Sequence, residues 1–349
     1  MTPVVIGERR IASGQPCFII AEAGVNHDGD LETALLLVDA AQAAGADAVK
    51  FQTFQAARLV TAQAPKAAYQ KARTDPGESQ KAMLERLELD EAAHRVLIER
   101  CAARGILFLS SPFDEESVDL LARLGVPAFK IPSGEITNPD LLERIGRHGL
   151  PVILSTGMST LAEVDKALQL LRAAGAGGIV LLQCTSAYPA PPAEINLRAM
   201  TTMAGAFALP VGYSDHTTGI EIALAAAALG ATVIEKHLTL DRNRPGPDHS
   251  ASLEPAEFRR MVEGIRSVEA SLGDGIKRPS ASERETAAVA RRSLVTAMEI
   301  KAGTLLASGH LVARRPGTGL EPAMRGTLVG RRVLRDLPAG TLLSLDMLA

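Results

Sequence analysis

The chain has 349 residues, of which 46% are hydrophobic, and its formal net charge at pH 7 is −3. This composition is typical of a globular protein and excludes a disordered chain. Charges of both signs are mixed along the sequence, so the pattern excludes the basic footprint of a nucleic-acid-binding or membrane-surface protein.

Targeting signals and cysteine usage indicate the compartment. The sequence contains no apolar run near the roughly 20 residues that span a membrane, and its first ten residues lack a signal-peptide core. Cys17, Cys101 and Cys184 are odd in number and far apart, which is typical of buried thiols and not of a disulfide framework or a zinc site. We therefore expect a cytoplasmic protein that binds neither membrane nor nucleic acid.

Eight short apolar runs rich in β-branched residues alternate with amphipathic helical patterns. They occupy residues 17–22, 48–52, 106–111, 128–133, 151–156, 178–185, 210–215 and 232–240. Continuous apolar strands that alternate with helices predict a parallel sheet covered on both faces. Eight such units predict an α/β fold of the (β/α)8 TIM-barrel type. A doubly wound open sheet is the alternative, but no glycine-rich fingerprint follows the first strand.

The C-terminal part follows a different pattern, because the sequence of residues 301–311 returns in modified form at 338–348. Neither copy could bury its apolar face alone, so we expect the two to pack together as a small β-rich unit. The predicted organisation is a barrel domain over residues 1–276, a linker over 277–290 and a small domain over 291–349.

Polar residues follow nearly every predicted strand, at the end of a TIM barrel where active sites are built. Lys50 and Lys130 stand late in apolar strands, where an unpaired ammonium group is costly to desolvate. Each lysine needs an anion, which is either a carboxylate, with Glu22 and Glu135 as candidates, or a ligand. Four hydroxyls favour a bound phosphate: Ser111, Ser133, Ser155 and Ser214.

Two histidines, His216 and His237, follow neighbouring strands at equivalent positions, so their side chains can converge. Two imidazoles without a thiolate suit a divalent ion such as Mn²⁺, with Mg²⁺ or Co²⁺ as alternatives, and leave open positions for a Lewis-acid role. Asp215 is a weak third ligand because it alternates away from His216 along an extended chain. The alternative interpretation is a hydrogen-bonded histidine at each strand edge.

Taken together, these motifs resemble the sialic acid synthase family of N-acetylneuraminate synthases and related nonulosonate synthases. The resemblance covers nearly the whole chain, through motifs at residues 21–30, 49–54, 110–114, 130–139, 154–158, 184–191, 212–217, 235–240, 246–255 and 314–320. So many motifs in this order are highly specific. The family combines a TIM barrel with a C-terminal SAF (antifreeze-like) domain, which agrees with the predicted architecture.

The resemblance implies a transferase that condenses phosphoenolpyruvate with open-chain N-acetylmannosamine to give N-acetylneuraminate and phosphate by C–O cleavage. Within the family, the 6-phosphate of that sugar is one alternative, and a legionaminate synthase that uses 2,4-diacetamido-2,4,6-trideoxymannose is another. Outside the family, the alternatives are a metal-dependent aldolase and a non-catalytic phosphosugar-binding protein.

The resemblance also implies roles for individual residues. Glu22 and Glu135 would transfer protons, in an order left open, and His216 and His237 would hold the metal. Phosphoenolpyruvate would contact Lys50, Ser111, Lys130, Ser133, Ser155, Ser186 and Ser214, and the sugar would contact Gln52, Tyr188, Asp248 and Arg315. Ser186 departs from the asparagine that many members of the family have at this position. In the implied homodimer, the SAF domain of one subunit sends Arg315 into the active site of its partner.

Overall fold

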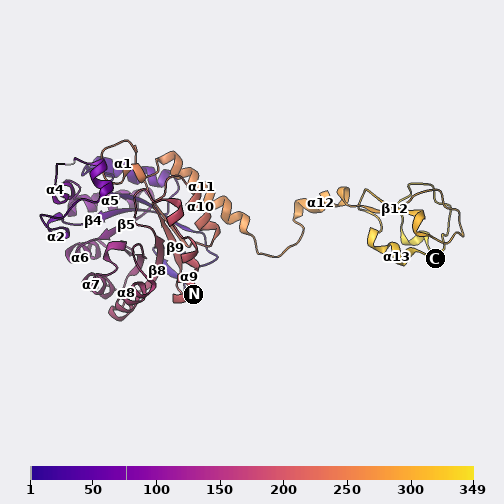
Figure 1. The fold of residues 1–349 in the computed structure, drawn as a ribbon, viewed down its shortest axis with the longest axis horizontal. Coiled ribbons are helices and arrows are strands. Elements are labelled where there is room, and N and C mark those ends of the chain that lie inside the picture. The colour runs from indigo at the N-terminus through magenta and orange to yellow at the C-terminus, as the bar shows by residue number, and fades with distance from the viewer. Residues whose placement is uncertain (1, 76) are drawn as a thin grey trace. The chain divides into compact units, whose positions relative to one another are not determined.

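A computed structural model describes residues 2–75 and 77–349, and the chain divides into two compact units, Met1–Gly273 and Asp274–Ala349. The first unit is built on one parallel sheet (Figure 1). Its strands are β3 (Phe18–Gly24), β4 (Ala48–Thr53), β5 (Leu107–Pro112), β6 (Phe129–Ile131), β7 (Pro151–Ser155), β8 (Gly178–Cys184), β9 (Val211–Asp215) and β10 (Val233–His237).

The order of these strands is β5-β4-β3-β10-β9-β8-β7-β6, and β5 also contacts β6, so the sheet nearly closes on itself. The predicted TIM barrel is confirmed, with a strand at each of the eight predicted positions. Several predicted runs are longer than their strands, because the chain turns away from the sheet directly after the last paired residue. The run 128–133, for example, ends as a strand at Ile131 and continues into the 3-10 turn η1 (Ser133–Glu135).

Helices cover the outside of the barrel (Figure 1). They are α1 (Leu31–Ala43), α5 (Glu91–Arg104), α6 (Glu115–Leu124), α7 (Pro139–Arg147), α8 (Leu161–Ala174), α9 (Arg198–Phe207), α10 (Glu221–Ala228) and α11 (Pro255–Leu272). Three short helices, α2 (Ala56–Leu59), α3 (Ala68–Arg73) and α4 (Gln80–Glu85), occupy the long connection between β4 and α5. None of the described helices is long and apolar enough to cross a membrane.

An antiparallel hairpin of β1 (Val4–Ile6) and β2 (Arg9–Ile11), which the sequence analysis did not predict, lies at the amino-terminal end of the barrel. Val4, Ile6 and Ile11 are buried and share one apolar cluster with residues at the starts of the strands, among them Phe18, Ala48, Ala128 and Val233. The hairpin therefore closes this end of the barrel with apolar side chains.

The second unit is small and rich in short β pairings. β11 (Ser293–Thr296) pairs antiparallel with β12 (Leu311–Arg314), and α13 (Arg325–Leu328) follows. The two repeat copies contribute equivalent leucines to one core, Leu306 and Leu311 from the first copy and Leu343 and Leu348 from the second. Residues 277–290, predicted as a linker, include a helix, α12 (Ala281–Ala290), whose side chains are all at least partly exposed.

Candidate active site

The carboxyl-terminal ends of the barrel strands surround a cavity of about 480 Å³. Every predicted site residue of the first unit lines it: Glu22, Lys50, Gln52, Ser111, Lys130, Ser133, Glu135, Ser155, Ser186, Tyr188, Ser214, His216, His237 and Asp248. The structure thus brings together side chains from all around the barrel, because parallel strands present their carboxyl ends on one side. Arg315 belongs to the second unit, where it is exposed.

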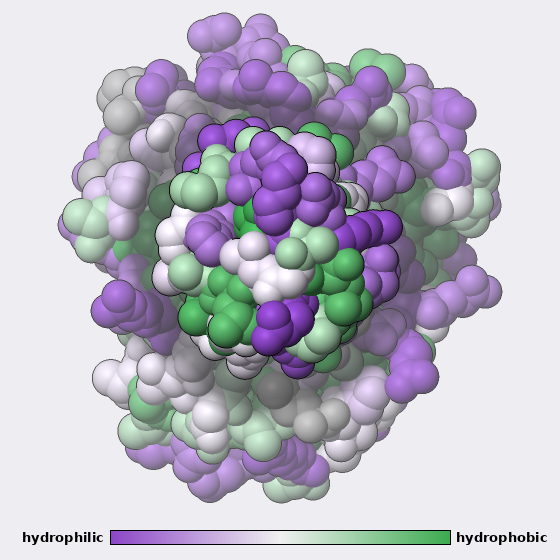
Figure 2. All heavy atoms as spheres, turned by 90° about the vertical axis from the view of Figure 1, so that its right-hand side faces the viewer, coloured by the Kyte–Doolittle hydropathy of each residue, from purple (hydrophilic) through white to green (hydrophobic). Residues whose placement is uncertain are grey.

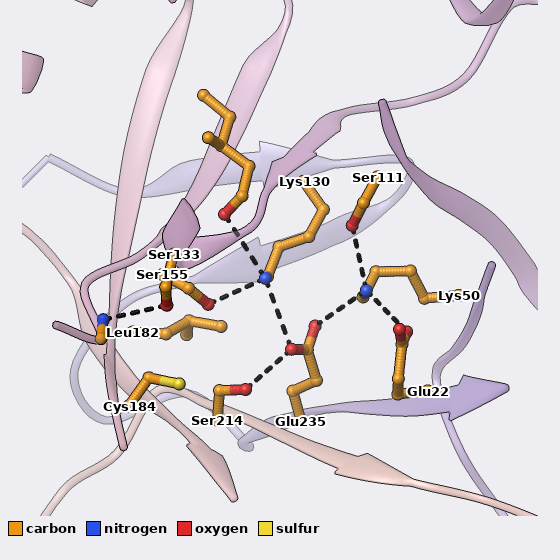
Figure 3. A network of polar contacts seen from close by, with 12 residues as sticks. Glu22, Lys50, Ser111, Lys130, Ser133, Ser155, Leu182, Cys184, Ser214 and Glu235 are labelled. Atoms are coloured by element: carbon orange, nitrogen blue, oxygen red, sulfur yellow. Dashed lines mark hydrogen bonds and ion pairs between the residues drawn. The ribbon is translucent and has the colours of Figure 1, made fainter. Parts of the chain in front are cut away.

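Two buried lysines form the centre of a polar network (Figure 3). The Nζ atom of Lys50 lies 2.6 Å from Glu22 Oε2 and donates a hydrogen bond to Ser111 Oγ at 3.0 Å. Lys130 Nζ donates to Ser155 Oγ at 2.8 Å. Both lysines are at least 97% buried, so their charges are stabilised by these partners and not by bulk water.

A second glutamate, Glu235 on β10, joins the two lysines and was missed by the sequence analysis. Its carboxylate oxygens lie 3.4 Å from Lys130 Nζ and 3.8 Å from Lys50 Nζ, and it accepts a hydrogen bond from Ser214 Oγ at 2.8 Å. The signal was present in the sequence, because Glu235 stands two residues before His237 and residues two apart in a strand face the same side.

Glu135 does not pair with either lysine, contrary to one of the two partnerships considered from the sequence. It lies beyond the end of β6, in η1, where its carboxylate accepts a hydrogen bond from Asn138 Nδ2 at 2.8 Å. The 3-10 turn after Ile131 carries the side chain away from Lys130. Glu135 still lines the cavity and is half-buried.

Burial and charge separate the two carboxylates that contact Lys50. Burial, which Lys50 only partly offsets, raises the pKa of Glu22. For Glu235 the penalty of burial is outweighed by Lys130 and Lys50, which lower its pKa to about 2. Glu235 therefore holds a fixed negative charge between the lysines, whereas Glu22 is the carboxyl group better suited to exchange a proton near neutral pH.

His216 and His237 lie side by side at the rim, with ring centroids 5.4 Å apart. The ring of Tyr188 packs against both, at 4.1 Å from His216 and 5.7 Å from His237. His216 Nδ1 donates to the carbonyl oxygen of Thr185 at 2.8 Å, so in the neutral ring Nε2 is the nitrogen with a free lone pair. Burial opposes a charge on this ring, but Cys184 and the Thr185 carbonyl outweigh it and raise the pKa of His216, so a metal would have to displace a proton from Nε2.

The two histidines fit a metal ion. Burial lowers the pKa of His237 well below its usual value, so the ring is neutral, and its buried Nδ1 has no hydrogen-bond partner among the described residues. A backbone carbonyl that fixes the tautomer of His216 is a typical arrangement behind a ligating histidine. Over residues 2–75 and 77–349, however, no group of three or more His, Cys, Asp or Glu side chains is placed to hold a metal. Water and substrate oxygens would have to complete the shell.

An ion pair on the outer side of the barrel wall connects the two strands that carry the histidines. Lys236 Nζ lies 2.7 Å from Asp215 Oδ2, and both side chains are fully buried. The other oxygen of Asp215 accepts hydrogen bonds from the backbone and the hydroxyl of Thr217. Asp215 therefore points away from the cavity, as the alternation of the strand predicts, and anchors the chain on either side of His216.

Two glycines allow close packing at the rim. At Gly24, φ is +54° and the pairing of β3 with β4 shifts register, which lets Gln52 Nε2 donate to Glu22 Oε1 at 3.2 Å. At Gly157, a Cβ atom would lie 2.4 Å from Ser186 Oγ and 2.8 Å from Ser133 Oγ. The backbone of Gly157 donates to that Ser133 hydroxyl at 2.9 Å, so a larger residue at position 157 would have to displace the serine hydroxyls.

Part of the cavity lining is apolar. Val25, Phe54, Met83 and Leu87 are buried in one cluster, against which Leu59, Leu84 and Phe113 pack. All seven line the cavity, and we call them the apolar wall. The cavity thus has a charged pole around the two lysines and an apolar pole along this wall.

A TIM barrel with a buried charged cavity at the carboxyl ends of its strands is the architecture of an enzyme. Residues 37–277 match the model of the NeuB family, and residues 291–349 match the SAF domain. The chain therefore belongs to the NeuB family, as the sequence motifs predicted, and its relatives include proteins named as legionaminic acid, pseudaminic acid and N-acetylneuraminate-9-phosphate synthases.

Three similar proteins illustrate the relationship. The N,N'-diacetyllegionaminic acid synthase of Campylobacter jejuni is 52% identical over 309 residues, which cover 88% of this chain and 92% of that protein. The synthase of the same name from Legionella pneumophila is 48% identical over 335 residues, with 95% and 94% covered. The crystal structure of an N-acetylneuraminic acid (sialic acid) synthetase from Leptospira borgpetersenii, in complex with citrate, matches with a TM-score of 0.71 at 37% identity and covers 82% of this chain and 95% of that one.

Proposed function

We propose that this protein condenses phosphoenolpyruvate with open-chain 2,4-diacetamido-2,4,6-trideoxymannose to give N,N'-diacetyllegionaminate and phosphate. The observation that carries the proposal is the buried charged pole next to the histidine pair. From the sequence motifs, N-acetylmannosamine is the expected acceptor. The two relatives at 52% and 48% identity bear the name of legionaminic acid synthases and favour the alternative acceptor.

The charged pole supplies the donors for phosphoenolpyruvate. Lys50 and Lys130 bring two ammonium groups, and the hydroxyls of Ser111, Ser155 and Ser214 already point into the same network. Charge-assisted hydrogen bonds of this kind bind phosphate and carboxylate oxygens strongly in a buried site. Glu235 accepts from the same donors, so its negative charge offsets part of the positive charge that the two lysines present to phosphoenolpyruvate.

The histidine pair is where the sugar aldehyde would react. A divalent metal held by His216 and His237, with Mn²⁺ as our expectation, would supply a Lewis acid for the aldehyde oxygen. Tyr188 packs against both rings and restricts the space beside them. The vinyl carbon of phosphoenolpyruvate then forms the new C–C bond with the aldehyde carbon.

Proton transfer completes the reaction. The aldehyde oxygen gains a proton, water adds to the carbon that carries the phosphate group and loses a proton, and the C–O bond to phosphate breaks. Glu22, at the base of the cavity beside Gln52, has the raised pKa that suits one of these transfers. Glu135, half-buried at the rim, is the second candidate.

A panel of acceptor sugars with phosphoenolpyruvate tests the proposal. We expect sugar-dependent phosphate release that is fastest with 2,4-diacetamido-2,4,6-trideoxymannose. In ¹⁸O-labelled water, the label should enter C2 of the product and not the released phosphate. Phosphate release with no dependence on any sugar, or label in the phosphate, would contradict the reaction proposed.

Arg315 is proposed to complete the site of a second subunit. It is exposed in the second unit, and that unit also exposes several large apolar side chains: Met298, Leu305, Val329, Leu334 and Leu345. Figure 2 shows hydrophobic side chains exposed between hydrophilic ones on one face of the molecule. In the proposed dimer, some of these side chains would be covered by the second chain.

Subunit mixing tests this arrangement. An inactive Lys130→Ala subunit and an Arg315→Ala subunit of impaired sugar use should regain about half of the wild-type activity per heterodimer, since one barrel keeps Lys130 and receives an intact Arg315. Verified subunit exchange without recovery would show that Arg315 does not serve the partner.

A further inference from the structure

We infer that the apolar wall selects an acceptor sugar whose tail is deoxygenated and uncharged, and that Met83 and Leu59 are specificity-determining residues. This inference rests on the proposed function, because it takes the charged pole as the site of phosphoenolpyruvate and the histidine pair as the site of the aldehyde. The tail of an open-chain sugar then extends along the part of the cavity that remains.

The wall offers no partner for a charged tail. Among the described residues that line the cavity, the only lysines or arginines are Lys50 and Lys130, and Glu22 and Glu235 already engage both in the charged pole. A terminal phosphate on the sugar would lie against apolar side chains without a cation from this barrel. An isolated anion in such surroundings is strongly disfavoured.

The wall also offers no partner for a terminal hydroxyl. Its buried members, Val25, Phe54, Met83 and Leu87, are between 93% and 99% buried and carry no polar hydrogen-bonding group apart from the weakly accepting Met83 sulfur. A methyl group placed there exchanges water for apolar contact, whereas a hydroxyl loses its hydrogen bonds to water. A 6-deoxy sugar therefore fits this pole better than its 6-hydroxyl counterpart.

Two neutral amides also line the cavity and suit an acetamido group. Gln70 and Gln80 both line the cavity, and Gln80 Nε2 donates to Gln70 Oε1 at 3.4 Å. Amide side chains donate and accept without adding charge, which matches the N–H and carbonyl of a second acetamido group. The cavity thus also offers polar groups that carry no charge.

The wall is formed before substrate binds. Met83 belongs to α4 and Leu59 to α2, both in the connection between β4 and α5, and the ring of Phe54 packs edge-on against Phe113 with centroids 6.0 Å apart. Packed side chains of this kind do not reorganise to accommodate a hydroxyl. From the discrimination that apolar pockets achieve, we expect a preference of about 10- to 200-fold for the deoxy sugar.

The test uses a pair of acceptors that differ by one oxygen atom, 2,4-diacetamido-2,4,6-trideoxymannose and 2,4-diacetamido-2,4-dideoxymannose, together with the 6-phosphate of the latter. The full-length protein is assayed for phosphate release from phosphoenolpyruvate, and the ratio of kcat/KM for the two neutral sugars is the readout. In the wild type we expect this ratio to favour the deoxy sugar, with the 6-phosphate used least.

Met83→Gln should lower the ratio about tenfold, because the new amide offers the 6-hydroxyl a hydrogen bond. Leu59→Gln is a second variant that keeps the test available if Met83→Gln does not fold. Leu59 is half-buried, a position that tolerates a polar side chain, and this substitution should also lower the kcat/KM ratio. Met261→Gln is the matched control: Met261 is fully buried in α11, away from the cavity, so the ratio should not change.

The outcomes separate the two proposals. If none of the sugars supports phosphate release, the proposed function itself is wrong. If the wild type turns over both neutral sugars with equal kcat/KM, or if a folded Met83→Gln or Leu59→Gln variant keeps the wild-type ratio, the selection by the wall is wrong while the condensation stands.

Discussion

At its carboxyl-terminal end the barrel buries four charged side chains in one network, whereas the cluster at its amino-terminal end is apolar. Lys50, Lys130, Glu22 and Glu235 meet around the cavity (Figure 3). At the other end, the β1–β2 hairpin seals the strands with Ile6, Ile11 and their neighbours. The same strands therefore supply a sealed, stabilising layer at one end and an open, charged layer at the other. Substitutions at the two ends should consequently have different effects.

The largest effect is expected at the charged end. Lys130→Ala should lower kcat/KM for phosphoenolpyruvate by about 10²–10³-fold, because a buried donor to the anion is lost. It should also destabilise the fold by about 3–5 kcal/mol, since Glu235 loses one of its two cations. Phosphate release and chemical denaturation measure the two effects.

A double variant separates charge balance from catalysis. Lys130→Met combined with Glu235→Gln removes a positive and a negative charge together and leaves Lys50 paired with Glu22. Stability should return to near the wild-type value while activity stays low. A double variant with wild-type activity would show that Lys130 is only a structural cation.

At the sealed end, the expected effect is on stability alone. Ile6→Ala should lower the free energy of unfolding by about 2–5 kcal/mol, because Ile6 is fully buried and the substitution leaves a cavity. Val5→Ala, in the same strand but 51% exposed, should change it by no more than about 0.5 kcal/mol. Activity per folded molecule should match the wild type in both variants. A loss of kcat in folded Ile6→Ala would contradict the view that this end of the barrel contributes to stability alone.

A smaller effect is expected from His27, which follows β3 at the charged end. Burial lowers its pKa from 6.5 to about 4. The unfolded chain therefore binds a proton more readily between these values, and stability is lost as the pH falls from 6.5 to 4. His27 should account for up to about 3 kcal/mol of this loss. Denaturation of His27→Gln across this range should show a flatter pH dependence, and an unchanged slope would contradict the assignment.

The carboxyl-terminal end of the barrel could be predicted from the sequence, whereas the hairpin at its amino-terminal end could not. The eight strands and the polar residues at their ends were evident because each strand is a continuous apolar run that closes on a polar group. The hairpin was not predicted, because three-residue strands such as Val4–Ile6 are too short to show a period, and their burial depends on the barrel they close. Tertiary packing of this kind has no local signal.

The sequence predicted most residues of the site but not which carboxylates pair with the two lysines. The lysines, serines and histidines follow from their positions after apolar strands, whereas the choice of Glu235 over Glu135 depends on a 3-10 turn after Ile131 that the apolar run conceals. The apolar wall was also missed. Only Leu59, Met83 and Leu84 lie on helices, and these helices, α2 and α4, are too short to show an amphipathic pattern. The other wall residues lie in loops that follow strands or helices, where no periodic pattern is expected.

That connection has a consequence for how acceptor preference could diversify. Most of the apolar wall comes from one continuous stretch of chain, residues 54–87. The charged pole and the histidine pair come from the barrel strands and the residues directly after them. If the apolar wall selects the sugar tail, grafting this stretch from a relative with a different acceptor should change which tail is accepted. The residues proposed to bind phosphoenolpyruvate lie outside the stretch and would be unchanged.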